Sequence, residues 1–206
     1  MNKKLVIASN NHNKIQDLKF ILEPIVGIEV VSQVQFNVPE IEETGLTFVE
    51  NAILKARNAC KYTNMPAIAD DSGLEIDALD KRPGVFSARY AGHETTVAEK
   101  IEKLLYELRD VPKPLRTARF QCVIVMLRSV SDPTPIICHG TWEGEITFVP
   151  AGSNGFGYAP IFWLPEHQCT VAELSSEVRN QISHRAQTLH IFNNYIKNLA
   201  PSLDLT

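Results

Sequence analysis

Acidic residues lie in two separated segments of this 206-residue chain, Glu40, Glu42 and Glu43 in one and Asp70 and Asp71 in the other. Carboxylates from distant segments can converge on a cation, and a site with oxygen ligands alone favours Mg²⁺. Magnesium suits triphosphate chemistry because it neutralises phosphate oxygens and lowers the pKa of bound water. Taken separately, the first segment is typical of a solvated loop and the second of an exposed turn, so the metal hypothesis depends on their combination.

A polar loop near the N-terminus could bind phosphate. It has the sequence Ser9-Asn10-Asn11-His12-Asn13-Lys14 and lies between an apolar stretch and a helical pattern. Free backbone N–H groups and the positive end of the helix would attract an anion, and Lys14 would add a full charge. The loop lacks the glycines of a Walker motif. The alternative is a surface turn with ordinary capping asparagines.

Aromatic residues separated by glycine follow later, in Gly155-Phe156-Gly157-Tyr158-Ala159-Pro160. Such a loop can present a stacking surface to a flat base, and each base–aromatic contact contributes about 1 to 3 kcal/mol. The alternative is a loop that its aromatic side chains anchor to the core.

Basic residues begin the last predicted helix, in Ser183-His184-Arg185, and Arg179 lies one short segment earlier. Ser183 is suited to the N-cap position. A cation at a helix N-terminus is mildly unfavourable, which favours a functional reason for Arg185. The alternative is a cap followed by two exposed basic residues.

Strands and helices that would position these residues alternate from the start of the chain. Leu5 to Ala8 reads as a strand, and apolar spacing predicts a helix over Asn13 to Leu22. Thr47-Phe48-Val49-Glu50 has the form of a capping box and predicts a second helix to about Tyr62. Ala67 to Ala69 is predicted to be a short strand that delivers the acidic pair on a turn, with Leu74 to Leu79 as the return strand.

The second half of the chain predicts further elements of both kinds. A capping box at Thr96 begins a helix to about Leu108. Phe120 to Leu127 and Ile136 to Phe148 read as an antiparallel hairpin, and a last helix runs from about Ser183 to Leu199. The predicted fold is therefore α/β, with a mixed central sheet flanked by helices in one domain over residues 1–206.

Composition excludes several classes of protein. The chain is 44% hydrophobic and 21% charged, and no apolar run approaches the length of a membrane span. The net charge of -4 and the absence of a long basic tract argue against a nucleic-acid partner. The four scattered cysteines suggest neither a zinc site nor a disulfide framework, so a reducing cytoplasm is expected.

Together these motifs resemble the inosine triphosphate pyrophosphatase family, from about Leu5 to Leu189. The matching segments are Ala8 to Lys14, Glu42 to Phe48 with Glu50-Asn51-Ala52, Ala69 to Leu74, Pro83-Gly84-Val85-Phe86-Ser87-Ala88-Arg89-Tyr90, Gly155 to Phe162, and Ala172-Glu173-Leu174 through Ser183-His184-Arg185. The resemblance implies two lobes with the active-site cleft between them, and Mg²⁺-dependent hydrolysis of non-canonical purine nucleoside triphosphates to the monophosphate and pyrophosphate. It also implies a homodimer.

The resemblance assigns a role to each candidate residue. Glu42 and Asp71 would hold magnesium, and Asp71 would also activate the water. Lys14, Lys55 and Asp70 would lie close by and complete the catalytic set, and Ser72 would touch substrate. The residues assigned to the triphosphate are Ser9, Asn10, Asn11, His12, Asn13 and Lys14. Those assigned to the base are Phe156, Gly157, Tyr158, Ala159, Arg179, His184 and Arg185.

Two positions depart from the pattern of that family. Its members usually have Asp where this chain has Ala159, and Lys where it has Arg179. Arg179 keeps the positive charge but replaces a compact ammonium with a planar fork. If the usual Asp accepts a hydrogen bond from the purine, Ala159 removes that acceptor and relaxes selectivity or weakens binding.

Two alternatives of other classes remain. The run Ile68-Ala69-Asp70-Asp71-Ser72 superficially resembles the strand and nucleophilic aspartate of a haloacid-dehalogenase-like phosphatase, although the usual Asp-x-Asp spacing is absent. A nucleotide-binding module without turnover is the other alternative, and Ala159 is the residue that favours it.

Overall fold

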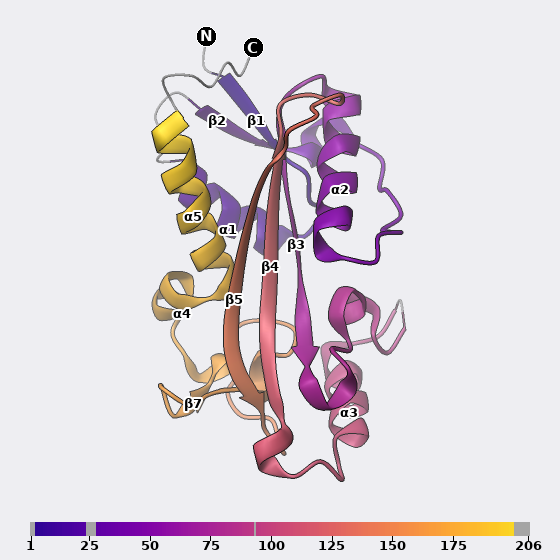
Figure 1. Cartoon of the computed structure of the whole chain (residues 1–206), viewed down its shortest axis with the longest axis vertical. Helices are drawn as coiled ribbons and strands as arrows, with labels where there is room; N and C mark the ends of the chain where they lie inside the picture. Colours follow the sequence, from indigo (N-terminus) through magenta and orange to yellow (C-terminus); the bar gives the residue numbers. More distant parts are fainter. Residues whose placement is uncertain (1–2, 24–27, 93, 200–206) are drawn as a thin grey trace. The chain divides into compact units, whose positions relative to one another are not determined.

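The protein is described by a computed structural model, which covers residues 3–23, 28–92 and 94–199 (Figure 1). Within these ranges the strands form one seven-stranded sheet in the order β2-β1-β3-β4-β5-β6-β7. The strands are β1 (Lys3–Ile7), β2 (Ile28–Ser32), β3 (Ala67–Ile76), β4 (Thr117–Leu127), β5 (Ile136–Ile146), β6 (Phe162–Leu164) and β7 (Cys169–Thr170). β1 pairs in parallel with β2 and β3, whereas β6 pairs antiparallel with β5 and β7. The predicted mixed sheet is thus confirmed.

Capping residues set the starts of the helices where the sequence predicted them. The α-helices are α1 (His12–Leu22), α2 (Phe48–Thr63), α3 (Val97–Glu107), α4 (Ser176–Ile182) and α5 (His184–Leu199). Short 3₁₀ helices span Gln33–Phe36, Asp77–Leu79, Gly84–Arg89, Lys113–Leu115, Ala159–Ile161 and Val171–Glu173. Both predicted capping boxes, at Thr47 and Thr96, are present. Ser183 Oγ accepts a hydrogen bond from Ala186 N at 3.2 Å, which confirms the predicted N-cap of α5.

The acidic pair is not on a turn, so that part of the sequence prediction is wrong. β3 continues without interruption from Ala67 to Ile76 and includes both aspartates. Residues 77–79 are a 3₁₀ helix and not the end of a return strand. The run Asp-Asp-Ser-Gly is typical of a turn when it is exposed, but here its aspartates are buried and ion-paired to lysines, which removes the reason for the chain to turn.

Contacts divide the chain into two compact units, and β3, β4 and β5 each continue from one unit into the other. The first unit comprises Met1–Asp71, Cys122–Gly140 and Gln187–Thr206, and the second comprises Ser72–Gln121 and Thr141–Ala186.

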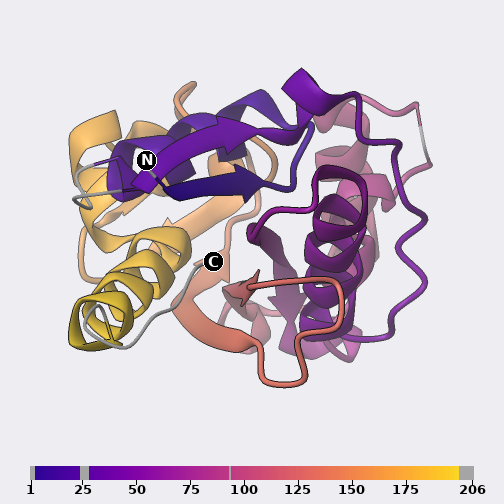
Figure 2. The same ribbon diagram turned by 90° about the horizontal axis from the view of Figure 1, so that it is seen from above.

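The first unit has helices on both faces of its sheet: α1 and α5 on one face and α2 on the other (Figures 1 and 2). Leu18 of α1 and Phe192 of α5 share a core with Ile7 of β1 and Ile68 of β3. α2 lies on the opposite face (Figures 1 and 2) and buries Ala52 and other small residues there. Adjacent residues of β3 therefore face different helices, because side chains alternate along a strand.

The second unit has its own core. Leu104 of α3 packs in one cluster with Leu74, Trp142, Ile161 and Phe162, all of which are buried. The end of the loop that carries Phe156 joins this cluster through Tyr158 and Ala159. None of the helices in the described ranges combines the length and the hydrophobicity that a membrane span requires.

Candidate active site

Asp70 and Asp71 are neighbours on β3 but form ion pairs with different helices. Lys14 Nζ of α1 lies 2.7 Å from Asp70 Oδ1, and Lys55 Nζ of α2 lies 2.7 Å from Asp71 Oδ1. Asp70 is 1% exposed and Asp71 6%. Because successive side chains of a strand point to opposite faces, the pair cannot act as one two-carboxylate group toward a single ligand.

Several polar side chains of the loop before α1 already accept hydrogen bonds from other groups of the protein. Asn11 caps the helix, and its Oδ1 accepts from Asn13 N at 3.0 Å and from Lys14 N at 3.3 Å. Ser9 Oγ accepts from Asn11 N at 3.1 Å, and Asn10 Oδ1 accepts from Gln33 Nε2 at 2.7 Å. The capping alternative therefore describes Asn11, while the exposed side chains of His12 and Asn13 remain open to a ligand.

Glu43 forms an ion pair with the same lysine, Lys55, that pairs with Asp71. Lys55 Nζ lies 3.0 Å from Glu43 Oε1 and so bridges Glu43 and Asp71. Glu42 is exposed, and Glu40 is exposed as well. Asp71 Oδ2 is buried and has no hydrogen-bond partner among the described residues. One carboxylate oxygen of Asp71 is thus satisfied by a lysine, and the other is left for a ligand.

Burial and neighbouring charges have opposite effects on the pKa values of Asp71 and Lys55. Burial raises the pKa of Asp71, although Lys55 and Lys14 oppose the shift. Burial also disfavours the charged form of Lys55, but Asp71, Asp70 and Glu43 outweigh it and raise the pKa of the ammonium. The result is a lysine that stays protonated and an aspartate that holds a proton more readily than an exposed carboxylate.

Magnesium can be tested against these residues. No group of three or more His, Cys, Asp and Glu side chains that could enclose a metal occurs in the described part of the chain. Mg²⁺ commonly takes one or two carboxylates and completes its shell with water and substrate phosphates. The unpartnered Oδ2 of Asp71 fits such a cation, and Glu42 is exposed next to Glu43, which Lys55 joins to Asp71.

In the second unit, Arg185 connects two of the predicted substrate residues. Arg185 Nη2 lies 3.4 Å from Ser72 Oγ, and the guanidinium lies 5.6 Å from the centre of the Phe156 ring. Arg185 is 4% exposed, whereas Phe156 is 44% exposed. Phe156 therefore keeps part of its side chain open to a stacking partner, and a buried cation lies near its ring.

The two aromatic residues of the glycine loop serve different purposes. Tyr158 is buried, and its hydroxyl donates to Ser87 O at 3.0 Å. The anchoring alternative therefore describes Tyr158, and the stacking hypothesis suits Phe156. Gly155 has a φ of +82°, a region that favours glycine, and an added Cβ would meet Ala159 Cβ at 3.2 Å and Arg179 Nη1 at 3.4 Å.

Arg179 lies on α4, a helix that the sequence did not predict because its seven residues lack an apolar repeat. Its Nη1 atom is buried and has no hydrogen-bond partner among the residues that the structure describes. The close packing of Arg179 and Ala159 around Gly155 brings together the two positions that depart from the family pattern.

Two aromatic residues that the sequence did not indicate as functional hold His184. Its ring stacks on Phe120 at 4.9 Å between centroids, and it lies 6.3 Å from Trp142. Both residues belong to the segments that the sequence predicted only as strands of a hairpin. Ser87 was also missed as a partner of Tyr158, although it lies in the segment Pro83 to Tyr90 that contributed to the family resemblance.

Comparison with known proteins identifies the family of this chain. The family model described as the Ham1 family matches residues 5–195. The chain is 52% identical over 187 residues to a dITP/XTP pyrophosphatase of Vibrio cholerae, which covers 91% of this chain and 93% of that protein. It is also 52% identical to the dITP/XTP pyrophosphatase of Salmonella paratyphi A, over 95% of this chain and 99% of that one.

A solved structure gives the same result for the fold. The HAM1 protein from Coxiella burnetii is 50% identical, superposes with a TM-score of 0.91 and covers 95% of this chain and 99% of its own. On the extent of both matches, this chain belongs to the Ham1 family.

Proposed function

We propose that this chain is a Mg²⁺-dependent pyrophosphatase that hydrolyses dITP, ITP and XTP to the monophosphate and pyrophosphate, and so removes non-canonical purines from the nucleotide pool. The observation that carries the proposal is Asp71: it is 6% exposed, one oxygen is paired to Lys55, and the other has no partner among the described residues. Relatives that are 52% identical are named dITP/XTP pyrophosphatases, which supports the same reaction here.

Asp71 acts as the general base in this proposal. A water oxygen forms a bond to phosphorus, the anhydride bond between the α and β phosphates breaks, and pyrophosphate leaves with the bonding electron pair. The proton of the water passes to the Asp71 carboxylate, whose pKa is raised by burial and is therefore better matched to this task than that of an exposed aspartate.

Cations of the first unit stabilise the charge on the triphosphate. Lys14 and Lys55 supply two fixed positive charges. Magnesium, held by Asp71 and Glu42, would neutralise phosphate oxygens when bound. The exposed polar side chains of the loop before α1 would contribute further hydrogen bonds to phosphate.

Residues of the second unit select the base. Phe156 stacks on the purine, and Arg179, His184 and Arg185 donate hydrogen bonds to it. Hypoxanthine and xanthine present a keto oxygen where adenine presents an amino group, so adenine would leave a donor unpaired. A buried mismatch of that kind discriminates strongly between substrates.

We infer a single functional domain over residues 1–206 that acts as a homodimer in the cytoplasm and has no nucleic-acid partner. The net charge of -4 argues against a nucleic-acid partner, and the four cysteines form no disulfide, which suits a reducing cytoplasm.

Purified protein incubated with ITP, dITP, XTP and ATP in the presence of Mg²⁺ tests the function. We expect the first three to yield pyrophosphate and the monophosphate, and ATP to react more slowly. Equal turnover of all four, or release of orthophosphate, would contradict the proposal. A phosphorylated aspartate trapped during turnover would indicate a haloacid-dehalogenase-like phosphatase, and tight binding without pyrophosphate release would indicate a binding module.

A further inference from the structure

The acidic loop of the first unit has no regular secondary structure of its own over residues 38–45. Three polar side chains of α2 contact it instead. Asn51 Oδ1 accepts from Gly45 N at 2.8 Å, Lys55 Nζ lies 3.0 Å from Glu43 Oε1, and Asn58 Nδ2 donates to Pro39 O at 2.8 Å. These contacts are distributed along the whole length of the loop.

The spacing of the three residues explains how one helix can hold an extended segment. Asn51, Lys55 and Asn58 are four and three residues apart, so they lie on one face of α2. Their partners occur in the reverse order along the chain, which means that the loop runs back along the helix. We call these three residues the α2 polar stripe.

Two details show that this contact is close. Asn51 is 0% exposed although it is an amide. A Cβ added to Gly45 would meet Glu50 Cβ at 2.6 Å and Asn51 Oδ1 at 2.7 Å, so only glycine lets the loop approach the first turn of α2. Asn51 Nδ2 is also buried, and it has no hydrogen-bond partner among the described residues.

We propose that the α2 polar stripe positions the acidic loop for cation binding, and that Asn51 and Asn58 are positioning residues for the Glu42 and Asp71 site. The cation part of this inference rests on the proposed function. Lys55, in the middle of the stripe, already joins the loop to Asp71 through Glu43. Asn51 and Asn58, on either side of Lys55, hold the loop in a fixed position relative to Asp71.

The alternative is that these amides only stabilise the fold. A purely structural role would lower the free energy of unfolding without changing metal affinity in the folded protein. Residues that orient metal ligands typically change metal affinity by about 10- to 100-fold when they are mutated. Metal affinity and stability therefore separate the two roles.

The experiment compares Asn51→Ala, Asn58→Ala, the double variant and Gly45→Ala with the unchanged chain. Arg57→Ala is the matched control, because Arg57 Nη1 also donates from α2 to a loop carbonyl, that of Val130, at 3.0 Å. Hydrogen–deuterium exchange of the metal-free proteins reports on residues 38–46, and calorimetric titration with Mn²⁺ alone reports on the cation site. Neither measurement needs substrate turnover.

We expect exchange at Gly45 to become about tenfold faster in Asn51→Ala, because its hydrogen-bond acceptor is lost. Mn²⁺ binding should weaken by about tenfold in Asn51→Ala and further in the double variant, whereas Arg57→Ala should change neither. Gly45→Ala disturbs the same contact from the loop side and should give the same pattern if Asn51→Ala folds poorly.

The possible failures are distinguishable. The inference would be overturned if the double variant and Gly45→Ala both exchanged residues 38–46 at the same rate as the unchanged chain. Faster exchange with unchanged Mn²⁺ affinity would overturn the cation role of the stripe. If the unchanged chain binds no Mn²⁺, the metal part of the proposed function is wrong, and faster exchange would still support the contact between stripe and loop.

Discussion

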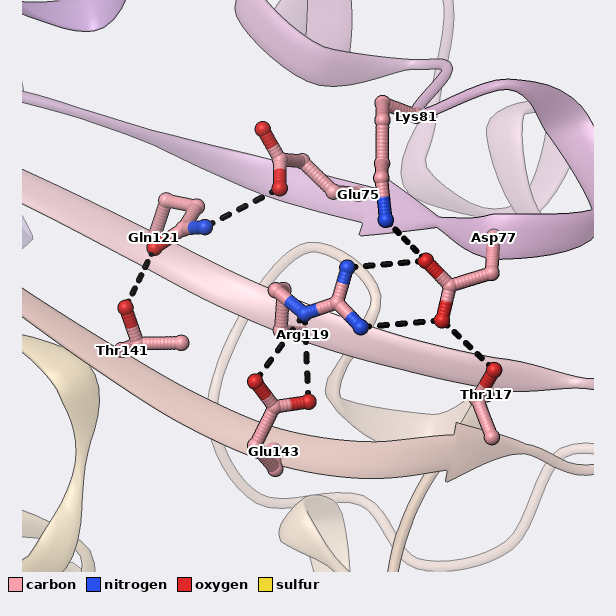
Figure 3. A network of polar contacts seen from close by, with 8 residues as sticks. All are labelled: Glu75, Asp77, Lys81, Thr117, Arg119, Gln121, Thr141 and Glu143. Carbon is pink, nitrogen blue, oxygen red and sulfur yellow. Dashed lines mark hydrogen bonds and ion pairs between the residues drawn. The ribbon is translucent and has the colours of Figure 1, made fainter.

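Each unit contains an aspartate within a cluster of charged residues, and the two aspartates differ in how many of their carboxylate oxygens have partners. In the second unit, Asp77 meets Arg119 through two contacts of 2.9 Å, and it also pairs with Lys81 and Thr117 (Figure 3). Both of its carboxylate oxygens are therefore satisfied. In the first unit, Asp71 is more deeply buried, yet only one of its oxygens has a hydrogen-bond partner among the described residues.

The pKa shifts of the two aspartates follow this difference. Hydrogen bonds from Arg119, Lys81 and Thr117 hold the pKa of Asp77 well below its ordinary value, whereas burial raises the pKa of Asp71. A saturated carboxylate such as Asp77 stabilises structure and has no capacity left for chemistry. An unsaturated, buried carboxylate such as Asp71 costs stability and is available to a ligand or a proton.

The largest expected effect comes from Asp71→Asn, which keeps the size of the side chain but removes the base. We expect kcat to fall by at least about a thousandfold. Triphosphate affinity, measured by calorimetry, should stay within about tenfold, because Lys14 and the loop before α1 are unchanged. Asp77→Asn is the matched control and should keep kcat within about twofold. Full activity in Asp71→Asn would disprove the assignment of the base.

An intermediate effect is expected from Ala159→Asp, which places a carboxylate beside Gly155 and near Arg179. If that carboxylate accepts a hydrogen bond from the purine, kcat/KM for ITP relative to ATP should rise about tenfold or more. Ser153→Asp adds the same charge to an exposed position of the same loop and should leave the ratio unchanged. An equal change in both variants would mean that charge alone is responsible.

The smallest effect is expected from Asp77→Asn on stability. Because the folded-state pKa of Asp77 is depressed, its stabilisation is present above the ordinary carboxyl pKa and is lost as the pH falls through the folded value. Urea unfolding at pH 7 should show a loss of about 0.2 to 1 kcal/mol, and the difference between variant and unchanged chain should shrink as the pH falls from 5 toward 2. A difference that stays constant over this range would show that Asp77 is not held by its ionised form.

Much of the fold could be predicted because its signals are local. The capping boxes at Thr47 and Thr96 depend on residues three positions apart, and both begin helices as predicted. The buried face of α5, with Leu189, Phe192 and Ile196, follows from helical spacing. The acidic pair was misplaced because local residue types suggested a turn, while the ion pairs that allow a continuous strand come from Lys14 and Lys55, distant in the sequence.

In the candidate site, too, local sequence indicated some features and distant contacts decided others. Residue types and order were sufficient to indicate the polar loop before α1, the acidic segments, the glycine loop and the basic start of α5, because each is a short continuous motif. Only the tertiary structure decided that Tyr158 is an anchor while Phe156 is exposed, and that Glu43 pairs with Lys55. It also assigned Asp70 and Asp71 to different lysines. Burial and partner choice depend on segments that meet in space, and no local pattern encodes them.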